Sequence, residues 1–493
     1  MNTISPKPGV FDVDLHHKDL YFRRTKIVAT IGPASSSPEK LRRLISKSLD
    51  VARINFSHGK AEDHLKTIQL IRKISGRLKK PVAILGDLCG PKIRVGEFVN
   101  GSVTLREGSV VTITTKPVIG TETLIPSQYK NLVREVVPGH SILLDDGNLE
   151  LKVVKKYRDR VEAKVIHGGV LKNKKGMNLP NTLLRVAALT AKDKNDVLYC
   201  IKGGVDYIAL SFVRKPADIR DLKNLLNRHR SDIPIIAKIE MPEALTNIQG
   251  IMELADGIMV ARGDLGVELP AKKVPIIQNK LIQIANTMNK PVIVATQMLE
   301  SMIENPQPTR AEASDVANAI WDGTDAVMLS AESAVGKHPL EAVRYLDSIA
   351  ADADAHYNPR IGLLADTLEE DLSGRTDVSV AFAACRTAEE IGAKLIVVFT
   401  EGGGSARLVS RLAANIPVIG ATTDIGNARR MGLLRGVESL PIPRARHLSE
   451  MLASIHPLLK TLKGLESGDR IVMTLGHPLW TTGTTNMMRV ETY

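Results

Sequence analysis

The sequence of 493 residues has few aromatic residues and few cysteines, and it contains no long apolar run. Aromatic residues make up 3% of the chain, too few for the stacking platforms that bind single-stranded nucleic acid. A formal charge of +12 favours anionic ligands, but the basic residues are scattered, which argues against specific nucleic-acid binding. No apolar segment approaches the ~20 residues that cross a membrane. We therefore expect anionic ligands, no specific nucleic acid and no membrane insertion.

Only three cysteines occur, at Cys89, Cys200 and Cys385, and no two of them form a CxxC pair. This spacing indicates neither a disulfide framework nor a zinc site, and it suits a reducing compartment. The polar stretch 1–24 lacks the apolar centre of a signal peptide. We therefore expect a cytoplasmic protein.

Short apolar runs that alternate with helical patterns dominate the larger part of the chain. They predict eight strands, at 26–31, 51–55, 81–87, 207–211, 234–240, 257–261, 291–297 and 326–330. One helix is expected at 39–48, with Ser36 or Ser37 as its cap and Pro38 in its first turn, and another at 242–254. This alternation predicts a (β/α)8 TIM barrel, in which functional residues gather at the C-terminal ends of the strands.

The gap between the third and fourth predicted strands is about 120 residues, far longer than a helix and two loops need. It contains turn signals such as Asp145-Asp146-Gly147-Asn148. Short strands are predicted at 102–105, 110–114, 141–144, 150–154 and 160–165. We interpret the gap as an inserted all-β lid domain, which at the catalytic end of the barrel would exclude water from the site.

A second α/β unit is predicted after the barrel. Its elements are helices at 378–391 and 406–414, strands at 394–400, 417–421 and 470–475, and a final loop at 476–486. The predicted organisation is an N-terminal segment (1–20), a barrel (21–91 and 190–356), the lid (92–189), a linker (357–375) and a C-terminal α/β domain (376–493).

Charged residues lie at the ends of two neighbouring predicted barrel strands. Lys238 and Glu240 are two residues apart, so they share one face of their strand, and Asp264 follows the next strand. Magnesium prefers one or two carboxylates plus substrate oxygens, which Glu240 and Asp264 can supply, with Lys238 placed where negative charge is transferred. A structural lysine–carboxylate pair at the rim of the barrel is the alternative interpretation.

Other predicted strands also end in polar residues. Arg53, Asn55 and Ser57 share one face at the end of the second strand, an arrangement that suits an anion next to a cation. The third strand ends at Asp87 and the seventh includes Thr296. Their coincidence at one end of the barrel favours an active site over a solvated rim.

A loop rich in helix breakers, 305–308, follows the seventh predicted strand. Thr309 and Glu312 then have the spacing of a capping box, which predicts that a helix begins there. The free amides of such a helix start are available to an anion or to a partner surface.

Several segments resemble pyruvate kinases. They cover nearly the full length in that family's order: KIVATIGPAS (26–35), VARINFSHG (51–59), IIAKIE (235–240), MVARGDLGVE (259–268), IVATQMLESMIE (293–304) and PTRAEASDVANAIWDGTDAVMLSAE (308–332). A barrel with a β-rich lid after its third strand and a C-terminal α/β regulatory domain is also that family's architecture. The chain is therefore identified as a member, of a bacterial type that looks potassium-independent.

The resemblance implies transfer of the phosphoryl group from phosphoenolpyruvate to ADP, giving pyruvate and ATP in the last step of glycolysis. It implies a catalytic role for Lys238, which would neutralise the phosphoryl group in flight, because positioning and charge dominate in a loose transition state. The resemblance also implies that Glu240 and Asp264 hold a divalent metal, magnesium or manganese. It implies that Arg53 binds the phosphate, that the amides of Gly263 and Asp264 bind the carboxylate, and that Thr296 lies near the face where the enolate is protonated. The implied nucleotide contacts are His58, Arg94 and, from the lid, Lys175. A second metal is expected to arrive with the nucleotide.

One motif departs from the family pattern at the monovalent-cation site. Members that need potassium hold it with an Asn, a Ser, an Asp and a Thr, and carry Asp-Thr-Lys-Gly-Pro-Glu before an Ile-Arg pair. Here the segment 87–92 reads Asp-Leu-Cys-Gly-Pro-Lys, so the threonine oxygen is lost and the glutamate is replaced by a lysine. We expect that potassium is not required and that the head group of Lys92 occupies a pocket lined by Asn55, Ser57 and Asp87.

The C-terminal domain contains a second departure. The family's effector loop corresponds to Thr400-Glu401-Gly402-Gly403-Gly404-Ser405, where Gly402 and Gly404 replace a serine and often an arginine. Thr400, Ser405 and the amides, including that of Gly403, remain, so a phosphorylated effector is expected, with a plain tight turn as the alternative.

The resemblance further suggests a homotetramer. Two rival functions are another magnesium-dependent TIM-barrel enzyme acting on an enol or keto acid, of aldolase or lyase type, and a non-catalytic binding protein driven by charge. Neither would need Lys238 and a nucleotide-facing lid.

Overall fold

The computed structural model describes residues 23–180, 182–357, 375–413, 416–460, 465–481 and 483–493. The predicted N-terminal segment 1–20 lies outside the described residues, as does the linker apart from its two end residues. The chain forms two compact units, and each is described by itself. The barrel unit comprises Thr25–Ser373 and Ile425–Arg435, and the C-terminal unit comprises Met1–Arg24, Gly374–Asp424 and Gly436–Tyr493.

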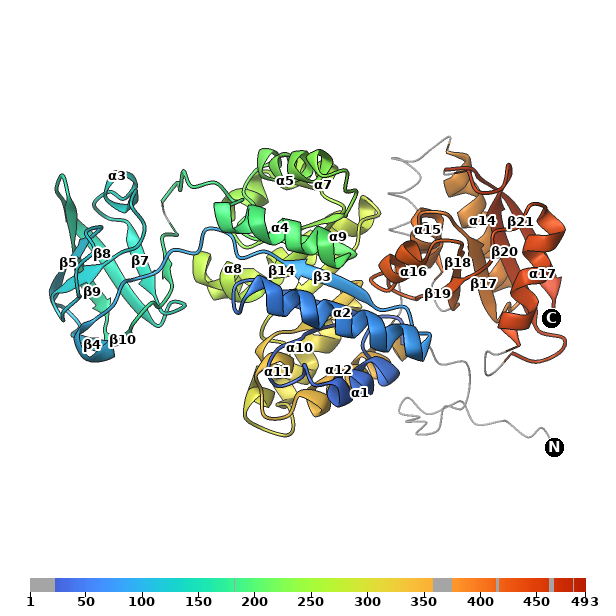
Figure 1. The fold of residues 1–493 in the computed structure, drawn as a ribbon, viewed down its shortest axis with the longest axis horizontal. Helices are drawn as coiled ribbons and strands as arrows, with labels where there is room; N and C mark the ends of the chain where they lie inside the picture. Colours follow the sequence, from blue (N-terminus) through green and yellow to red (C-terminus); the bar gives the residue numbers. More distant parts are fainter. Residues whose placement is uncertain (1–22, 181, 358–374, 414–415, 461–464, 482) are drawn as a thin grey trace, which may run out of the picture. The chain divides into compact units, whose positions relative to one another are not determined.

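Eight parallel strands close into a barrel in the barrel unit (Figure 1). Their order around the barrel follows the chain, and the first strand pairs with the last. Their bounds are β1 (Lys26–Thr30), β2 (Val51–Asn55), β3 (Ala83–Asp87), β12 (Tyr207–Leu210), β13 (Ile235–Ile239), β14 (Gly257–Ala261), β15 (Val292–Ala295) and β16 (Ala326–Leu329). The predicted TIM barrel is confirmed.

Helices pack around these strands. Their bounds are α1 (Pro38–Lys47), α2 (Ala61–Leu78), α4 (Ala191–Gly203), α5 (Pro216–Arg228), α6 (Pro242–Thr246), α7 (Ile248–Leu254), α8 (Arg262–Glu268), α9 (Val274–Thr287), α10 (Arg310–Trp321), α11 (Ala331–Ala334) and α12 (Pro339–Ala355). Ser37 caps α1, and the capping box of Thr309 and Glu312 is formed at α10. The prediction of one helix over 242–254 is wrong, because non-helical backbone at Asn247 separates α6 from α7.

Side chains of the barrel strands alternate between two cores, since successive residues of a strand face opposite sides. Ile236 and Met259 pack inside the barrel, whereas Ile235 and Ile258 pack between the strands and the helices. Leu433, from the segment Ile425–Arg435, joins the interior core. The next residue of β13 on the interior face after Ile236 is therefore Lys238.

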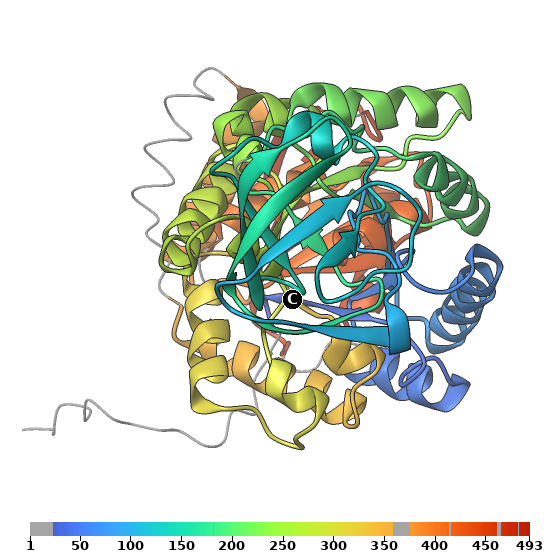
Figure 2. The ribbon, with the colours of Figure 1, turned by 90° about the vertical axis from the view of Figure 1, so that its left-hand side faces the viewer.

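The described part of the inserted domain is all-β, as predicted, apart from one short α-helix and a 3-10 turn at Val99–Gly101, and it has its own core. Its elements are β4 (Ser102–Leu105), β5 (Val110–Thr114), β6 (Leu124–Pro126), α3 (Leu132–Glu135), β7 (Ser141–Leu144), β8 (Leu149–Lys156), β9 (Arg160–His167), β10 (Gly169–Lys172) and β11 (Met177–Asn178). Six strands form one sheet in the order β11-β7-β8-β9-β5-β6, and β10 pairs with β4 in a second sheet. Figure 2 shows these strands in cyan to teal. The short elements β6, α3, β10 and β11 were not predicted, because each is too brief to produce a periodic pattern.

The C-terminal unit contains a five-stranded sheet in the order β19-β18-β17-β20-β21. Its elements are α14 (Thr376–Glu390), β17 (Leu395–Phe399), α15 (Gly404–Leu412), β18 (Val418–Thr422), β19 (Val437–Pro441), α17 (Leu448–Leu459), β20 (Arg470–Gly476) and β21 (Thr485–Thr492), while α16 (Ile425–Met431) belongs to the barrel unit. The predicted final loop at 476–486 ends earlier than expected, because the unpredicted strand β21 begins at Thr485 and pairs antiparallel with β20. In the described part of the chain, no helix combines the length and the apolar character needed to cross a membrane.

Candidate active site

Three charged side chains meet on the interior face at the C-terminal end of the barrel strands. Arg53 of β2 contacts Asp87 of β3, with 2.7 Å between Nε and Oδ2, and Lys238 of β13 lies 3.3 Å from the other carboxylate oxygen. Arg53 also donates from Nη1 to Thr30 Oγ1 at 2.8 Å. Burial alone would raise the pKa of Asp87, but Lys238 and Arg53 outweigh that effect and hold the pKa below its usual range. Asp87 is thus an ionised carboxylate that fixes two cations in place.

Lys238 also contacts Glu240, as their shared strand face predicts. The distance from Lys238 Nζ to Glu240 Oε1 is 2.8 Å, and Nζ donates to Ser211 Oγ at 2.7 Å. Burial opposes the charge of Lys238, but Asp87 and Glu240 raise its pKa above the usual value. Burial raises the pKa of Glu240, while Lys238 acts in the opposite direction. The ammonium group therefore stays charged in a nearly water-free setting.

The residues after β12 were not predicted to belong to the site, yet they support it. Phe212 has a φ of 56°, a conformation rarely adopted by a bulky residue, and its amide donates to Glu240 Oε2 at 2.8 Å. Ser211 Oγ donates in turn to the Leu88 carbonyl at 2.8 Å. No sequence signal marks these residues, because their role depends on backbone geometry and on strands distant in the chain.

Helix α8 begins directly after β14, so its first turn carries Gly263 and Asp264 into the site. Gly263 donates its amide to Thr296 Oγ1 at 2.7 Å. Thr296 and Gln297 have φ values of 68° and 55°, and a β-branched residue is strained in that region. Arg262 holds this turn by donating to both carbonyls, at 2.8 Å to Thr296 and 3.0 Å to Gln297. The two predicted residues Gly263 and Thr296 are therefore in direct contact.

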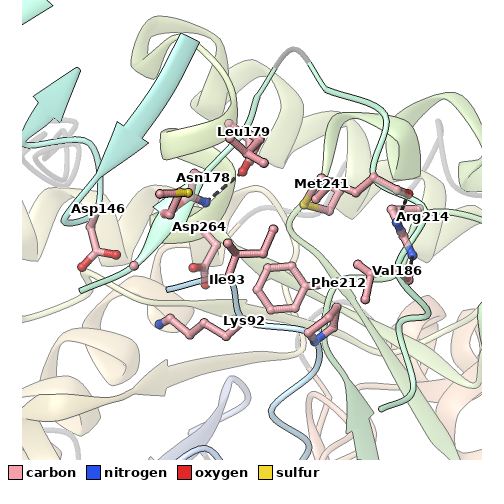
Figure 3. Close-up of a pocket in the computed structure, with 15 residues that line it drawn as sticks. Lys92, Ile93, Asp146, Asn178, Leu179, Val186, Phe212, Arg214, Met241 and Asp264 are labelled. Carbon is pink, nitrogen blue, oxygen red and sulfur yellow. Dashed lines mark hydrogen bonds between the residues drawn. The ribbon is translucent and has the colours of Figure 1, made fainter. Parts of the chain in front are cut away.

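A cavity of about 680 Å³ opens beside these groups. It is lined by Asp264, Gly263 and Thr296 and by other polar residues at or near the strand ends, among them Arg262, Gln297, Asp315, Ser330, Glu332 and, from the lid, Asp146. Figure 3 shows an adjoining pocket where Lys92, Asp146 and Asp264 lie near one another. The lid and the barrel therefore line the same space.

The structure does not bring Lys92 into the pocket predicted for it. Within the described residues its side chain forms no ion pair with Asp87 and no hydrogen bond with Asn55 or Ser57, and it lines the cavity with Asp146 instead (Figure 3). Asp87 is already paired with Arg53 and Lys238, so the ammonium of Lys92 has no unpaired carboxylate to approach there. The Asn55 side chain instead accepts the Ser57 amide at 3.0 Å.

Of the three predicted nucleotide residues, His58 lies between β2 and α2 of the barrel, whereas Arg94 and Lys175 belong to the lid. Burial lowers the pKa of His58, and Lys92 and Arg94 lower it further. Arg94 donates to the Lys174 carbonyl at 2.8 Å, and Lys175 pairs with Asp145 at 2.7 Å. His58 and Arg94 thus belong to one electropositive cluster, whereas Lys175 is engaged inside the lid.

The predicted effector loop lies in the C-terminal unit. Gly403 has a φ of 81° and donates its amide to Thr400 Oγ1 at 3.0 Å, and α15 starts at Gly404, two residues earlier than predicted. Ser405 is hydrogen-bonded to Thr485 at 2.6 Å. A cavity of about 630 Å³ in this unit was not predicted, and it is lined by Arg444, Arg446, His447, His477 and Trp480, among others. Its basic residues lie in loops without a recognisable motif.

The carboxylates fit a divalent metal of the magnesium type. The described residues hold no cluster of three or more His, Cys, Asp or Glu side chains able to enclose a metal. Glu240 and Asp264 lie close enough for their charges to interact, and Asp264 faces the open cavity. An acidic residue beside a space for substrate oxygens, with a second carboxylate within electrostatic reach, matches the preference of magnesium for one or two carboxylates plus substrate oxygens.

Comparison with known proteins decides the family. The model for "Pyruvate kinase, barrel domain" matches residues 22–343, and the model for "Pyruvate kinase, alpha/beta domain" matches residues 378–491. The chain belongs to the pyruvate kinase family. It is similar to pyruvate kinase 2 of Synechocystis, with 45% identity over 95% of this chain and 79% of the relative, and to the pyruvate kinase of Geobacillus stearothermophilus, with 44% identity over 95% and 80%.

A solved structure agrees with this assignment. The crystal structure of a pyruvate kinase from Cryptosporidium parvum matches with a TM-score of 0.89 and 35% identity, covering 95% of this chain and 96% of that one. The predicted phosphotransferase function is thereby confirmed, and the aldolase or lyase alternative receives no support. Pyruvate kinases require a divalent metal.

Proposed function

We propose that this pyruvate kinase transfers the phosphoryl group of phosphoenolpyruvate to ADP at the C-terminal end of its barrel, with Lys238 as the central catalytic residue. The observation that carries the proposal is the position of Lys238 Nζ, 2.8 Å from Glu240 and 3.3 Å from Asp87, with 11% of its side chain exposed. A charged ammonium in a buried site stabilises a migrating phosphoryl group more strongly than it would in water.

Glu240 and Asp264 would hold the divalent metal, magnesium or manganese. When bound, the metal supplies positive charge that neutralises the carboxylate and phosphoryl oxygens of the substrate. Arg53 binds the phosphate, and its orientation is fixed by Asp87 and Thr30. These contacts hold the reacting groups in line, which is the main requirement for phosphoryl transfer.

The substrate carboxylate is assigned to the amides of Gly263 and Asp264. Because the Gly263 amide is bonded to Thr296 Oγ1, the carboxylate has to take over this hydrogen bond. The Thr296 hydroxyl, which still donates to the Ala295 carbonyl at 2.6 Å, then faces the enolate that receives a proton. ADP is assigned to His58 and Arg94, with Lys175 leaving Asp145 to reach the nucleotide as the lid moves.

A direct assay separates this function from its rival. Pyruvate and ATP are measured after addition of phosphoenolpyruvate and magnesium, with ADP present or omitted. Pyruvate kinase activity requires both products to appear in equal amounts and only with ADP. Consumption of phosphoenolpyruvate without ADP would instead favour a lyase or an aldolase.

Potassium is proposed not to be required. The support is the segment 87–92, where Leu88 and Lys92 replace the threonine and the glutamate of potassium-dependent relatives. Lys92 adds its charge from the cavity wall near Asp146. Turnover should change less than about twofold when potassium replaces tetramethylammonium at equal ionic strength, because Lys92 already supplies a positive charge beside the cavity. The double variant Leu88→Thr with Lys92→Glu should gain a potassium requirement, and a many-fold activation of the parent enzyme contradicts the proposal.

A phosphorylated effector is proposed to bind the C-terminal unit. The glycine loop is linked to the basic cavity by an ion pair of 3.3 Å between Glu401 and Arg444. Amides at a helix start and nearby arginines suit a phosphate group. Calorimetry with phosphorylated sugars and AMP tests this, with Arg446→Ala as the variant that should lose binding. No heat from any compound in the panel counts against a phosphate site.

We also propose a cytoplasmic homotetramer. Within the described sheet of the C-terminal unit, β21 pairs on one side only, and it exposes Met487, Met488 and Val490. An open edge strand with apolar side chains is a ready partner surface. Light scattering with and without an effector measures the oligomer, and a monomer under both conditions would exclude the tetramer.

A further inference from the structure

The loop between β12 and α5 contacts both the catalytic groups and the segment by which the lid returns to the barrel. Ser211 and Phe212, at its start, hold Lys238 and Glu240 as described above. Arg214, two residues further on, extends toward the return segment, residues 182–189 (Figure 3). One short loop thus touches the lid connection and the reacting end of the barrel.

Arg214 binds the return segment through its main chain. Its guanidinium donates from Nη1 to the Leu184 carbonyl at 2.5 Å and from Nη2 to the Val186 carbonyl (Figure 3). Arg214 is 8% exposed, and its buried Nε has no partner among the described residues. A buried cation with two carbonyl acceptors is costly to move, because any shift leaves donors unsatisfied.

The base of this clamp is rigid. The Arg214 amide donates to Asp218 Oδ2 at 2.9 Å, and the Arg214 carbonyl accepts from Asn247 Nδ2 at 2.9 Å. Asp218 lies in the first turn of α5, and Asn247 separates α6 from α7. Two neighbouring parts of the barrel wall therefore fix the backbone from which the guanidinium extends.

The opposite side of the return segment is bonded to the body of the lid. The Arg185 amide donates to Glu135 Oε1 at 3.4 Å, and Glu135 belongs to α3 and also accepts from Tyr129 at 2.5 Å. Arg185 lies between Leu184 and Val186, whose carbonyls both accept from Arg214, and in an extended chain the backbone polar groups of successive residues point to opposite sides. The segment is therefore held between Arg214 of the barrel and Glu135 of the lid.

We propose that Arg214 is a positioning residue for phosphoryl transfer, which sets where the lid stands over the barrel and hence where Lys175 meets the nucleotide. The proposal rests on the nucleotide-binding role proposed for the lid. Loosening the clamp lets the lid shift, and a misplacement of about 1 Å can cost on the order of 100-fold in rate. Phosphoenolpyruvate is assigned to the barrel alone, so its binding should be affected less than that of ADP.

The test compares Arg214→Met, which removes the donors and keeps apolar volume, with Arg214→Lys, which keeps the charge. Arg220→Met is the matched control, because Arg220 lies exposed on α5. We expect Arg214→Met to raise KM for ADP at least about tenfold with less than about threefold change in KM for phosphoenolpyruvate. Arg214→Lys should recover part of this loss, and the control should match the parent.

Hydrogen exchange of residues 182–189 gives a second measurement, which does not depend on activity. In Arg214→Met we expect faster exchange there than in the parent and unchanged exchange in the barrel strands. The proposal is overturned if a folded Arg214→Met enzyme keeps its KM for ADP, or if KM for both substrates rises equally without recovery in Arg214→Lys. If Arg214→Met does not fold, Arg214→Lys decides alone, and a normal KM for ADP then overturns the proposal. A parent enzyme that makes no pyruvate would refute the proposed function itself, which is a separate outcome.

Discussion

Replacing Lys238 by Met separates the catalytic role of this residue from its role in stability. The side chains of Asp87 and Glu240 are each 1% exposed, and both lose their contact with the ammonium in the variant. Asp87 keeps Arg53 at 2.7 Å, whereas Glu240 keeps, among the residues that the structure describes, only the Phe212 amide at 2.8 Å. The main structural consequence is therefore an insufficiently compensated charge on Glu240.

Breaking a buried ion pair by removing one partner costs about 3–5 kcal/mol, and the remaining Arg53 contact favours the lower end of that range. Burial already raises the pKa of Glu240, and loss of Lys238 removes the opposing effect, so the pKa rises further. A divalent metal ligated by Glu240 compensates this carboxylate again. At 100 times its dissociation constant the metal adds about 2.7 kcal/mol to stability.

The assay is thermal and chemical unfolding of the parent and of Lys238→Met, with EDTA or with manganese, together with pyruvate formation. We expect lower stability in EDTA, partial recovery with manganese, and turnover reduced by at least about 10³-fold in both conditions, since charge stabilisation of the transition state is lost. Lys272→Met, at an exposed site, serves as the control and should behave as the parent. Near-normal turnover, or stability equal to that of the parent in EDTA, would refute this reasoning.

Three further changes have predicted outcomes. Burial raises the pKa of Glu268 from 4.5 to about 7, so the folded protein takes up a proton and its stability falls as the pH rises from 4.5 to 7. The neutral side chain of Glu268→Gln cannot titrate, so the variant does not lose stability in this way. In metal-free buffer, the difference in unfolding free energy between variant and parent should therefore shift in favour of the variant by up to about 3 kcal/mol between pH 4.5 and 8. Parallel pH profiles of the two proteins would contradict this. Thr309→Ala removes the cap whose hydroxyl accepts the Glu312 amide at 3.2 Å, and urea unfolding should record a loss of about 1 kcal/mol, with no loss speaking against a stabilising cap. Asp315→Asn weakens the 2.5 Å contact that orients Arg262. Steady-state kinetics should give a KM for phosphoenolpyruvate raised by only about 2–10-fold, because the Asp315 side chain is 43% exposed and solvent partly screens the ion pair. An unchanged KM would exclude this role for Asp315.

The sequence by itself determined the barrel and the face on which its charged residues lie. Alternation along β13 places Lys238 on the same interior side as Ile236, and the same rule places Arg53 with Val51. Such patterns are local, so they survive without knowledge of the neighbouring strands. The sequence motifs around Glu240 and Asp264 also indicated the pyruvate kinase family.

Only the tertiary structure decided which charges meet. The sequence placed Lys92 beside Asp87, whereas in the barrel Arg53 and Lys238 contact Asp87 and Lys92 lines the cavity. The contributions of Phe212 and Arg214 likewise depend on a positive φ and on a lid segment reached through the fold. Periodicity fixes the side of a strand on which a residue lies, but pairing depends on distances between strands that the chain order alone does not specify.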